Sequence, residues 1–254
     1  MTRVAISAGI LGLALVLHRD AQADIYVTNY GGNTIGEYTN SGTVVNASLI
    51  SGLSSPWGIA VSGSDIFVAN NGSNTIGEYT TSGAVVNASL ISGLNSPTGI
   101  AVSGSDIFVA NFGSGTIGEY TTSGTTVNAS LISGLDDPYD VRVSGSNLFV
   151  ASYYGGIGEY TTSGTTVNAS LISTDLYPAG LAVLGSDLYV ANYGYDEIGE
   201  YTTSGTTVNA SLISGLDGPI GIVVTPSAVP EPSSFVMMGF GSVALLAVFR
   251  RRVF

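Results

Sequence analysis

Carboxylates are the reactive side chains that this sequence offers in greatest number. Four of them, Asp136, Asp137, Asp140 and Asp175, lie in the central part of the chain. Two carboxylates about 5–10 Å apart can cleave a glycosidic bond, one as acid and the other as base or nucleophile. No motif selects a particular pair from these four. The sequence therefore leaves a carboxylate-dependent glycan hydrolase or lyase open as an alternative function.

The composition excludes most other catalytic chemistry. The chain has no cysteine and no lysine, and its single histidine, His18, lies in a segment that we expect to be removed. Serine–histidine and cysteine–histidine catalysis, lysine Schiff bases and imidazole zinc sites are therefore ruled out for the body of the protein. Calcium needs clustered oxygen ligands, for which Asp136–Asp137 and Asp196–Glu197 are weak candidates. We expect no other metal and no cofactor.

The body of the chain, Asp24–Ala228, is strongly acidic. It holds 16 acidic residues and one basic residue, Arg142. A surface of this charge repels nucleic acid and anionic membranes, so neither is an expected partner of the body. With 44% apolar residues the chain is not disordered in composition, and its many glycines favour an all-β protein with frequent turns.

One phrase, I-G-E-Y-T-T-S-G or a near copy, occurs five times. Its first glycine recurs at intervals of 41, 41, 40 and 41 residues, at Gly36, Gly77, Gly118, Gly158 and Gly199. Each unit contains four apolar runs of strand length, which in the second unit are 58–61, 65–70, 75–80 and 84–94. This period and strand count predict a β-propeller of five four-stranded blades. A parallel β-helix is the alternative fold.

The phase of the repeat suggests how the propeller closes. The body begins at Asp24 with the second strand of a unit and ends at Gly218–Val224 with the first strand of a unit. Pairing of these terminal strands would complete the first blade and close the ring. We therefore assign residues 24–226 to the propeller.

The unit P-x-G-I-A-V … D-I-F-V-A-N … G-E-Y resembles the NHL-type propeller repeat over most of the body. That family commonly has six blades rather than five. The resemblance implies a module that binds proteins, RNA or small ligands, and some relatives are calcium-dependent hydrolases. Because the basic residues used for RNA are absent from this sequence, RNA binding is not carried over.

The N-terminus has the features of a signal peptide spanning residues 1–23. Arg3 precedes a 14-residue apolar run, Val4–Leu17, that is short for a membrane span. Ala21 and Ala23 then supply the small residues that signal peptidase requires, with cleavage before Asp24. The sequence thus predicts an N-terminal signal helix and export of the body from the cytoplasm.

The C-terminus, residues 227–254, contains three elements in a fixed order. The motif V-P-E-P-S-S (229–234) is followed by an apolar run expected to form a transmembrane helix (235–249) and by an arginine cluster (250–252). Basic residues after the helix keep that end in the cytoplasm. This order resembles the PEP-CTERM sorting signal, with Pro230, Glu231, Pro232, Arg250, Arg251 and Arg252 carrying the match.

The PEP-CTERM resemblance implies processing by an exosortase in a Gram-negative bacterium that makes exopolysaccharide. It also implies transient anchoring in the inner membrane, followed by release or transfer to the cell surface. An ordinary C-terminal membrane anchor is the alternative. Either arrangement places the body on the outer side of the inner membrane.

Comparison of the five units separates two faces of the predicted propeller. The connections between first and second strands, and between third and fourth strands, are nearly uniform, whereas the other two sets vary. Aromatic and acidic residues gather in the variable set, a combination that suits sugar or protein binding, although neutral drift of exposed loops gives the same variation. The candidate ligand-binding residues are Trp57, Tyr139, Asp140, Arg142, Tyr153, Tyr177, Tyr193, Tyr195 and Asp196.

On the innermost strand, Asp140 replaces the glycine found at Gly58, Gly99, Gly180 and Gly221, and Arg142 replaces the alanine found at Ala60, Ala101 and Ala182. Residues two apart on a strand share a face, so the pair is expected near the central channel. We favour a compensating ion pair over a cation that faces a ligand. The five glutamates of the repeated phrase are expected to be hydrogen-bond acceptors to a neighbouring strand or blade, and the repeated N-A-S a feature of strand four.

The sequence therefore predicts a secreted surface or matrix protein whose propeller is a non-catalytic binding or scaffold module. Exopolysaccharide or a surface protein is the expected partner of the body, and an exosortase-type enzyme is the expected partner of the C-terminus. The alternatives are the carboxylate-dependent hydrolase or lyase and a protein–protein interaction propeller.

Overall fold

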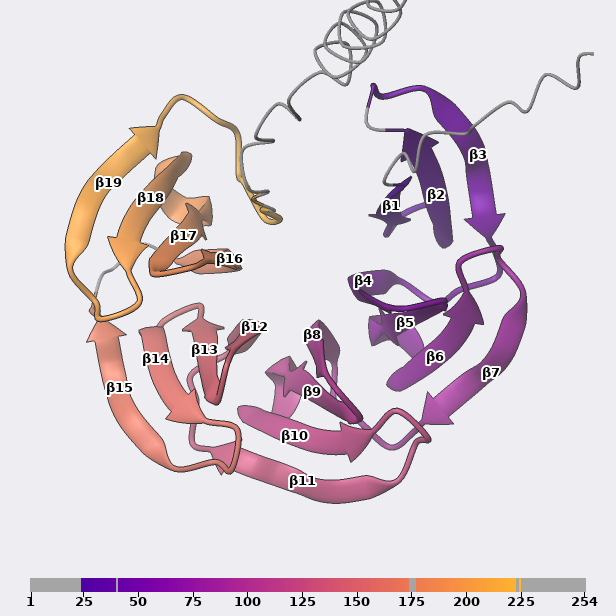
Figure 1. Ribbon diagram of the computed structural model, residues 1–254, viewed down its shortest axis with the longest axis horizontal. Coiled ribbons are helices and arrows are strands. Elements are labelled where there is room, and N and C mark those ends of the chain that lie inside the picture. Colours follow the sequence, from indigo (N-terminus) through magenta and orange to yellow (C-terminus); the bar gives the residue numbers. More distant parts are fainter. Residues whose placement is uncertain (1–23, 40, 174–176, 223, 225–254) are drawn as a thin grey trace, which may run out of the picture.

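The computed structural model describes residues 24–39, 41–173, 177–222 and 224. These residues form five antiparallel sheets arranged around one axis as the blades of a propeller (Figure 1), as the repeat predicts. The predicted signal helix and the predicted transmembrane helix both lie outside the described residues. Within the described part of the chain, no helix is long and apolar enough to cross a membrane.

The blades follow the chain in order, with consecutive strands paired side by side. The strands are, in the first blade, β1 (Asp24–Asn29), β2 (Thr34–Thr39) and β3 (Val44–Ile50); in the second, β4 (Pro56–Ser62), β5 (Asp65–Asn70), β6 (Thr75–Thr80) and β7 (Val85–Ile91); in the third, β8 (Pro97–Ser103), β9 (Asp106–Asn111), β10 (Thr116–Thr121) and β11 (Thr126–Ser133); in the fourth, β12 (Pro138–Ser144), β13 (Asn147–Ser152), β14 (Gly156–Thr161) and β15 (Thr166–Ile172); and in the fifth, β16 (Pro178–Leu184), β17 (Asp187–Asn192), β18 (Glu197–Thr202) and β19 (Thr207–Ile213).

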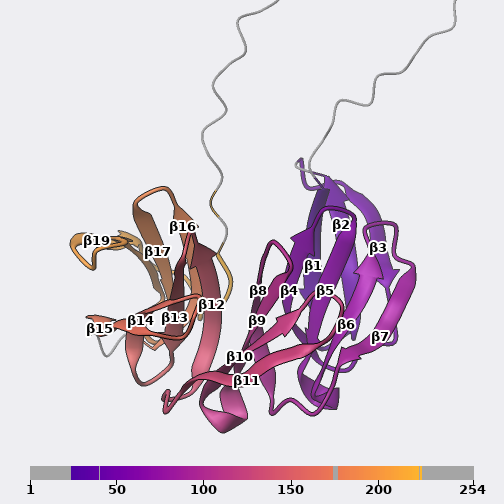
Figure 2. The ribbon, with the colours of Figure 1, turned by 60° about the horizontal axis from the view of Figure 1, so that its bottom comes forward.

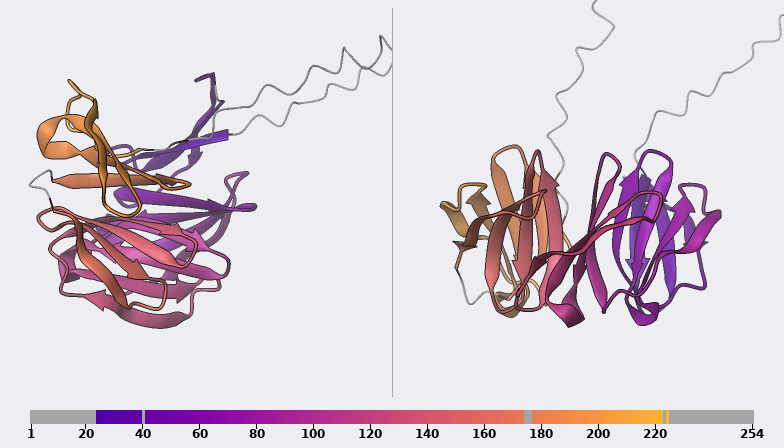
Figure 3. Two further views of the ribbon diagram at one scale, coloured as in Figure 1. Left: turned by 60° about the vertical axis from the view of Figure 1, so that its left-hand side comes forward. Right: turned by 90° about the horizontal axis from the view of Figure 1, so that it is seen from below.

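The order of strands sets which residues reach the axis and which reach the rim. The first strands of the units, β4, β8, β12 and β16, lie innermost, and the fourth strands form the circumference (Figure 1). Seen from the side, the sheets stand next to one another and their connections lie on two opposite faces (Figures 2 and 3).

The part of the chain that the structure describes does not form the predicted closure of the ring. The first sheet has three strands, and within the described residues Gly218–Ile222 neither forms a strand nor pairs with β1. Next to β16, the segment occupies the place that the inner strand of a following blade would take. A Cβ added to Gly180 would lie 2.1 Å from the Ile220 carbonyl oxygen, just as one added to Gly58 would lie 2.2 Å from that of Thr98. The C-terminal segment thus packs on the fifth blade but does not complete the first.

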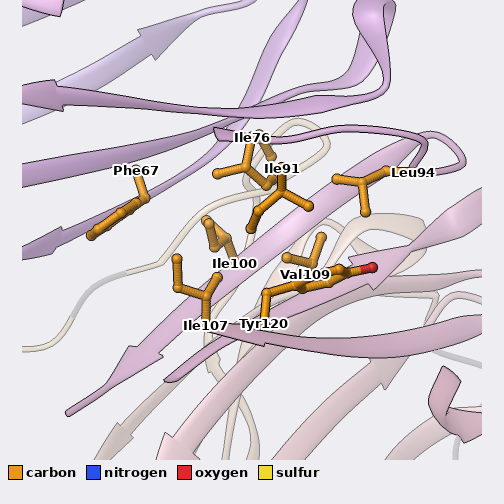
Figure 4. Close-up of a cluster of buried hydrophobic side chains, with 9 residues drawn as sticks. Phe67, Ile76, Ile91, Leu94, Ile100, Ile107, Val109 and Tyr120 are labelled. Carbon is orange, nitrogen blue, oxygen red and sulfur yellow. The ribbon is translucent and has the colours of Figure 1, made fainter. Parts of the chain in front are cut away.

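The hydrophobic core is divided into clusters that lie between neighbouring blades. In the cluster between the second and third blades, Phe67 and Ile76 pack with Ile107, Val109 and Tyr120 (Figure 4). Equivalent clusters join the first blade to the second, the third to the fourth and the fourth to the fifth. Because alternate residues of a strand point to opposite faces, the second, third and fourth blades each bury both faces of the sheet against their neighbours.

The first and fifth blades each leave one face open. Ile213 of the fifth blade is 49% exposed, whereas its counterpart Ile132 in the third blade is 5% exposed. On the first blade, Ile25 is 44% exposed, while the corresponding Ile66 in the second blade is fully buried. Positions that are buried between neighbouring blades elsewhere in the ring are therefore exposed to solvent on these two open faces.

The glycine of the repeated phrase makes room for the tyrosine two residues later. A Cβ on Gly118 would lie 2.7 Å from both Cε2 and the hydroxyl oxygen of Tyr120, so the ring lies directly over the glycine. Burial of this ring raises the pKa of the Tyr120 hydroxyl. The G-x-Y pattern is therefore a packing unit of the third strand.

The glutamate between them accepts hydrogen bonds, as predicted, in the fourth and fifth blades. Glu159 accepts one from the Asn147 amide at 2.7 Å, and Glu200 accepts one from the Tyr189 hydroxyl at 3.2 Å. Both donors lie on the neighbouring second strand. In the third blade, desolvation and then the nearby Asp106 raise the pKa of Glu119. These acids belong to the scaffold.

The repeated N-A-S also has a local structural role. The Asn87 side-chain oxygen accepts the backbone N–H of Ser89 at 3.1 Å, at the place where pairing between β6 and β7 is irregular. The same bond forms in the other blades. The bond satisfies the serine N–H, which lies outside the regular pairing of the third and fourth strands. This agrees with the predicted role of N-A-S as a feature of strand four.

Candidate functional site

The two sets of variable connections lie on the same face and are bonded to each other. The backbone N–H of Phe112, after β9, donates to the Ser96 carbonyl before β8 at 3.2 Å. Tyr153 donates in the same way to Asp137 at 2.9 Å. In three blades the connection between second and third strands also contains a short 3-10 helix, η1 (Asn71–Ser73), η2 (Phe112–Ser114) and η3 (Tyr193–Tyr195).

Aromatic rings on this face form a continuous chain of contacts. Tyr30 of the first blade lies edge-on to Trp57 of the second, and Trp57 lies edge-on to Tyr139 of the fourth, with ring centroids 5.4 Å apart in both pairs. Tyr139 also contacts Phe112 of the third blade at 5.6 Å and stacks on Tyr153 at 5.5 Å. These contacts already join four blades.

Tyr153 extends the chain of rings to the fifth blade. Its centroid lies 5.0 Å from that of Tyr154, 5.1 Å from Tyr177 and 6.2 Å from Tyr193. We call the whole set the aromatic surface: Tyr30, Trp57, Phe112, Tyr139, Tyr153, Tyr154, Tyr177 and Tyr193.

The contact between Trp57 and Tyr139 depends on the small residue between them in the blade order. Both occupy the position after the proline that begins an inner strand, and Thr98 holds this position in the third blade. Thr98 is buried, and its hydroxyl donates toward the Ala110 and Pro138 carbonyl oxygens. The second and fourth blades can therefore bring their large rings together above the third.

The aromatic surface is both ordered by packing and open to solvent. Trp57, Tyr139 and Tyr153 are partly buried, whereas Tyr30 and Tyr154 are 51% and 61% exposed. Burial raises the pKa of the Tyr139 hydroxyl, and the neighbouring tyrosines add to the rise. Edge-to-face and offset contacts such as these stabilise a fixed arrangement of rings. The result is a set of uncharged rings that hold one another in place and are partly open to solvent.

Tyr177 has an unusual backbone conformation. Its φ of 49° is in the left-handed region, where the equivalent residues of other blades are Ser55, Ser96 and Asp137. A bulky residue there is strained. Its ring fits against Gly194, where a Cβ would come within 2.3 Å of Tyr177 Cδ2. Strain of this kind often accompanies a functional position.

The predicted ion pair between Asp140 and Arg142 is present. Nη1 of Arg142 lies 2.7 Å from Oδ1 of Asp140, and the Asp140 carboxylate also accepts the backbone N–H groups of Val141 and Leu181 at 2.9 Å. Arg142 Nε donates to the Leu181 carbonyl at 2.9 Å. The pair thus bonds both backbone groups of Leu181 on the inner strand of the next blade.

Asp140 is unsuited to act on a ligand. It is 5% exposed, and desolvation raises the pKa of its carboxyl, while Arg142 and the two backbone donors oppose the rise. Asp196 is also engaged in structure, because its carboxylate accepts the Gly218 N–H at 2.8 Å, as Asn33 and Asn74 accept those of Ser55 and Ser96.

The remaining candidates are placed less centrally. Tyr195 is 55% exposed on η3 but is not one of the eight contacting rings. Asp136 and Asp137 lie in the connection before β12, and Asp175 lies outside the described residues. Among the described residues, no group of three or more acidic or histidine side chains could hold a metal ion.

Three members of the aromatic surface were not in the predicted ligand-binding set. Tyr30, Phe112 and Tyr154 lie in the same variable connections as the predicted residues, so their position in the repeat was the signal for them. The sequence did not indicate which rings touch, because that depends on the angle between blades.

A comparison with known protein families identifies the C-terminal residues. Residues 228–252 match the PEP-CTERM protein-sorting motif. The chain carries a PEP-CTERM sorting motif. This motif marks a secreted protein of Gram-negative bacteria that an exosortase sorts to the cell surface, and here it follows a propeller body. No curated protein sequence matches the chain.

Solved structures similar to the propeller include both enzymes and binding proteins. A catalytically inactive histidine-to-alanine variant of virginiamycin B lyase from Staphylococcus aureus, with quinupristin, is 21% identical, with a TM-score of 0.65 over 80% of this chain and 71% of that one. A streptogramin B lyase is 19% identical, with a TM-score of 0.59 over 79% and 83%. A nidogen/laminin complex contains a chain 17% identical, with a TM-score of 0.65 over 76% and 80%. At these identities the likeness is one of fold.

Proposed function

We propose that the propeller is a non-catalytic carbohydrate-binding module, displayed at the cell surface, whose binding site is the aromatic surface. The observation that supports this function is the continuous contact of eight rings contributed by all five blades. Flat apolar rings can stack on the C–H faces of sugar rings, and binding sites generally combine such rings with a few polar groups. An extended row of rings suits a polymer better than a small molecule.

The charge of the body favours a neutral polymer as the ligand. Asp136, Asp137 and Asp217 lie in the variable connections of the same face, Asp137 acts electrostatically on Tyr139, and the body has no lysine. Arg142, its one cation, is already bonded to Asp140 and to the backbone. An anionic polysaccharide would therefore meet repulsion without a compensating cation. We infer a neutral exopolysaccharide as the ligand.

Two observations support a binding role over catalysis. The inactive variant of virginiamycin B lyase has an alanine in place of a histidine, whereas Asp24–Ala228 of the present chain contains no histidine. Among the predicted acids, Asp140 is buried and paired. The fold likeness to two lyases nevertheless makes a carboxylate-dependent lyase or hydrolase the second candidate function.

A glycan array, probed with the secreted protein with and without calcium, tests the proposal. We expect binding to neutral polysaccharides, loss of this binding in Trp57→Ala and Tyr153→Ala, and little change in Tyr195→Ala, whose ring lies outside the aromatic surface. No binding to any glycan would overturn the carbohydrate proposal, and capture of a surface protein instead would favour the interaction module. Turnover of a glycan that is lost in Asp136→Asn would favour the enzyme.

We further propose that the C-terminal segment anchors the protein in the inner membrane only until an exosortase acts on it. Pro230, Glu231 and Pro232 form the centre of the matched motif. Replacing the three residues with alanine should retain the protein in the inner-membrane fraction, with the full-length mass. If the variant reaches the cell surface as the wild type does, the motif is not the processing signal.

A further inference from the structure

The outermost strand of each blade exposes an uncharged edge. The five strands are β3, β7, β11, β15 and β19, and each contains the sequence V-N-A-S-L-I. Their first five residues are exposed in every blade. In β7, Val85 is 63% exposed and Val86 is 53% exposed. Because consecutive side chains point to opposite faces of a strand, both faces of this half of β7 are in solvent.

These strands also have a free backbone edge. Each is the last strand of its sheet and pairs only with the third strand of its own blade within the described residues. Figure 1 shows all five along the circumference of the ring. Their first five residues are exposed, whereas the leucine near the end of β3, β7, β11 and β15 lies against the Thr-Thr-Ser-Gly turn of the next blade. An edge strand presents unpaired N–H and C=O groups in a row, which can bond a further strand.

Two usual protections against edge pairing, charge and proline, are missing from these strands. One is present, because pairing is irregular at the repeated asparagine, where the Asn87 side chain of β7 already accepts the Ser89 N–H. Natural edge strands carry lysine, proline or inward-pointing charges that prevent pairing with another molecule. None of the five strands contains a charged residue or a proline, although the body holds 16 acidic residues elsewhere. The five outer strands, which we call the rim, are therefore an uncharged part of an otherwise acidic protein.

We propose that the rim is a self-association surface on which an outer strand of one copy pairs, edge to edge, with an outer strand of a second copy. The partner is another copy because the five edges have nearly the same sequence, so every edge meets a matching edge. Antiparallel pairing of two such strands gives a two-fold symmetric contact that joins two blades into one sheet. With five edges per ring, the contacts extend from copy to copy and form an open assembly.

The net charge of the body opposes this association at low ionic strength. Copies that carry so many carboxylates repel each other over a Debye length, which shortens from about 30 Å at 0.01 M salt to about 8 Å at 0.15 M. Since the paired strands themselves are uncharged, added salt weakens the repulsion and leaves the contact intact. Self-association is therefore expected to strengthen with salt, the opposite of an interface built on ion pairs.

Sedimentation velocity of the full secreted protein, over a range of protein and salt concentrations, tests the proposal. We expect species larger than a dimer that increase with concentration and with salt. A variant with lysine at the rim (Val45→Lys, Val86→Lys, Val127→Lys, Val167→Lys and Val208→Lys) should associate at least about tenfold more weakly, since each edge then carries a charge. If five lysines prevent folding, the variant changed only at Val127, Val167 and Val208 should show a partial loss of association.

Two further variants separate edge pairing from other causes. The charge control places five lysines in the adjacent exposed turns (Ser41→Lys, Ser82→Lys, Ser123→Lys, Ser163→Lys and Ser204→Lys). It should associate at least as strongly as the wild type, because it lowers the same net charge without placing a lysine on the paired edge. The second, Ile25→Lys with Ile213→Lys, changes the open faces of the first and fifth blades. Overturning results are a monomeric wild type at all concentrations, equal loss in the turn control, or loss in the open-face variant alone.

Discussion

The carboxylate of Asp140 on β12 accepts the backbone N–H of Leu181 on β16 at 2.9 Å, so a side chain of the fourth blade holds the inner strand of the fifth. Arg142 completes the contact by donating to the carbonyl of the same residue. In the second, third and fifth blades the two positions are glycine and alanine, at Gly58 and Ala60 in the second. This interface is therefore the one described place where an ion pair joins two inner strands.

Removal of Arg142 should destabilise the propeller. Arg142→Ala leaves Asp140 buried without its cation, and breaking a buried pair in this way costs about 3 kcal/mol or more. Urea unfolding at pH 7 should show a lower midpoint. The double variant Asp140→Gly with Arg142→Ala restores the residues of the other blades and should recover most of the loss. A single variant with the midpoint of the wild type would show that the pair contributes nothing.

The glycine of the repeated phrase should not tolerate a methyl group. Gly118→Ala places a Cβ 2.7 Å from the Tyr120 ring, which is fixed in the core, so we expect a loss of about 2 kcal/mol from overpacking. Gly31→Ala is the control, since nothing lies within 4 Å of the added atom. Thermal unfolding of the two variants should differ clearly. Equal midpoints would mean that the tyrosine ring moves aside at little cost.

Most of the blade could be predicted from the sequence because its signals are local and repeated. The predicted second strand of the second unit, 65–70, coincides with β5, and the predicted third strand, 75–80, with β6. Turn glycines and short apolar runs fix these boundaries within a few residues of chain. Repetition at a constant period then fixes the number of blades, since each unit needs a neighbour to cover its face.

The closure of the ring could not be predicted in the same way. The pattern of Gly218–Val224 indicates that the segment can form a strand, but pairing with β1 depends on an encounter between the two ends of the propeller. In the structure the segment makes the local contacts, with the Asp196 carboxylate and with Gly180, and not the distant one. The aromatic surface is a parallel case, since the loop positions were predictable and the contacts between blades were not.

The open side of the ring should be visible in stability measurements. Ile132→Ala removes a buried side chain between the third and fourth blades and should cost about 3 kcal/mol. Ile213→Ala changes the same position on the open face of the fifth blade and should cost at most about 0.5 kcal/mol. Urea unfolding compares the two directly. Equal losses would show that the first and fifth blades are packed together in solution.

Replacement of the strained Tyr177 should change stability and binding in opposite directions. Tyr177→Asn places a residue that accepts positive φ at a position with φ of 49°, which should stabilise the protein by about 1 kcal/mol. The same change removes a ring from the aromatic surface and should weaken polysaccharide binding. Tyr30→Asn is the control, because it removes a ring at a position without positive φ and should give no gain in stability. A loss of stability in Tyr177→Asn would mean that ring contacts outweigh the strain.

Acid should stabilise the propeller through three carboxyls. Desolvation raises the pKa of Asp140, and desolvation followed by repulsion from a neighbouring aspartate raises the pKa of Glu78 and Glu119. A group whose pKa is raised on folding binds its proton more tightly in the folded state, so the unfolded chain releases protons first. Its contribution to stability is complete below the ordinary pKa, 3.8 for aspartate and 4.5 for glutamate, and is lost as the pH rises through the folded-state pKa.

The free energy of unfolding should therefore fall as the pH rises above these ordinary pKa values, as measured by urea unfolding at constant ionic strength. Replacement of Glu78 and Glu119 by glutamine should reduce the slope, because the amides do not titrate. Glu159→Gln, at the same position in the fourth blade, should cost some stability, because an amide oxygen accepts the Asn147 hydrogen bond less strongly than a carboxylate does. Stability that rises with pH over this range would contradict the assignment, because it would require carboxyls whose pKa falls on folding to outweigh these three.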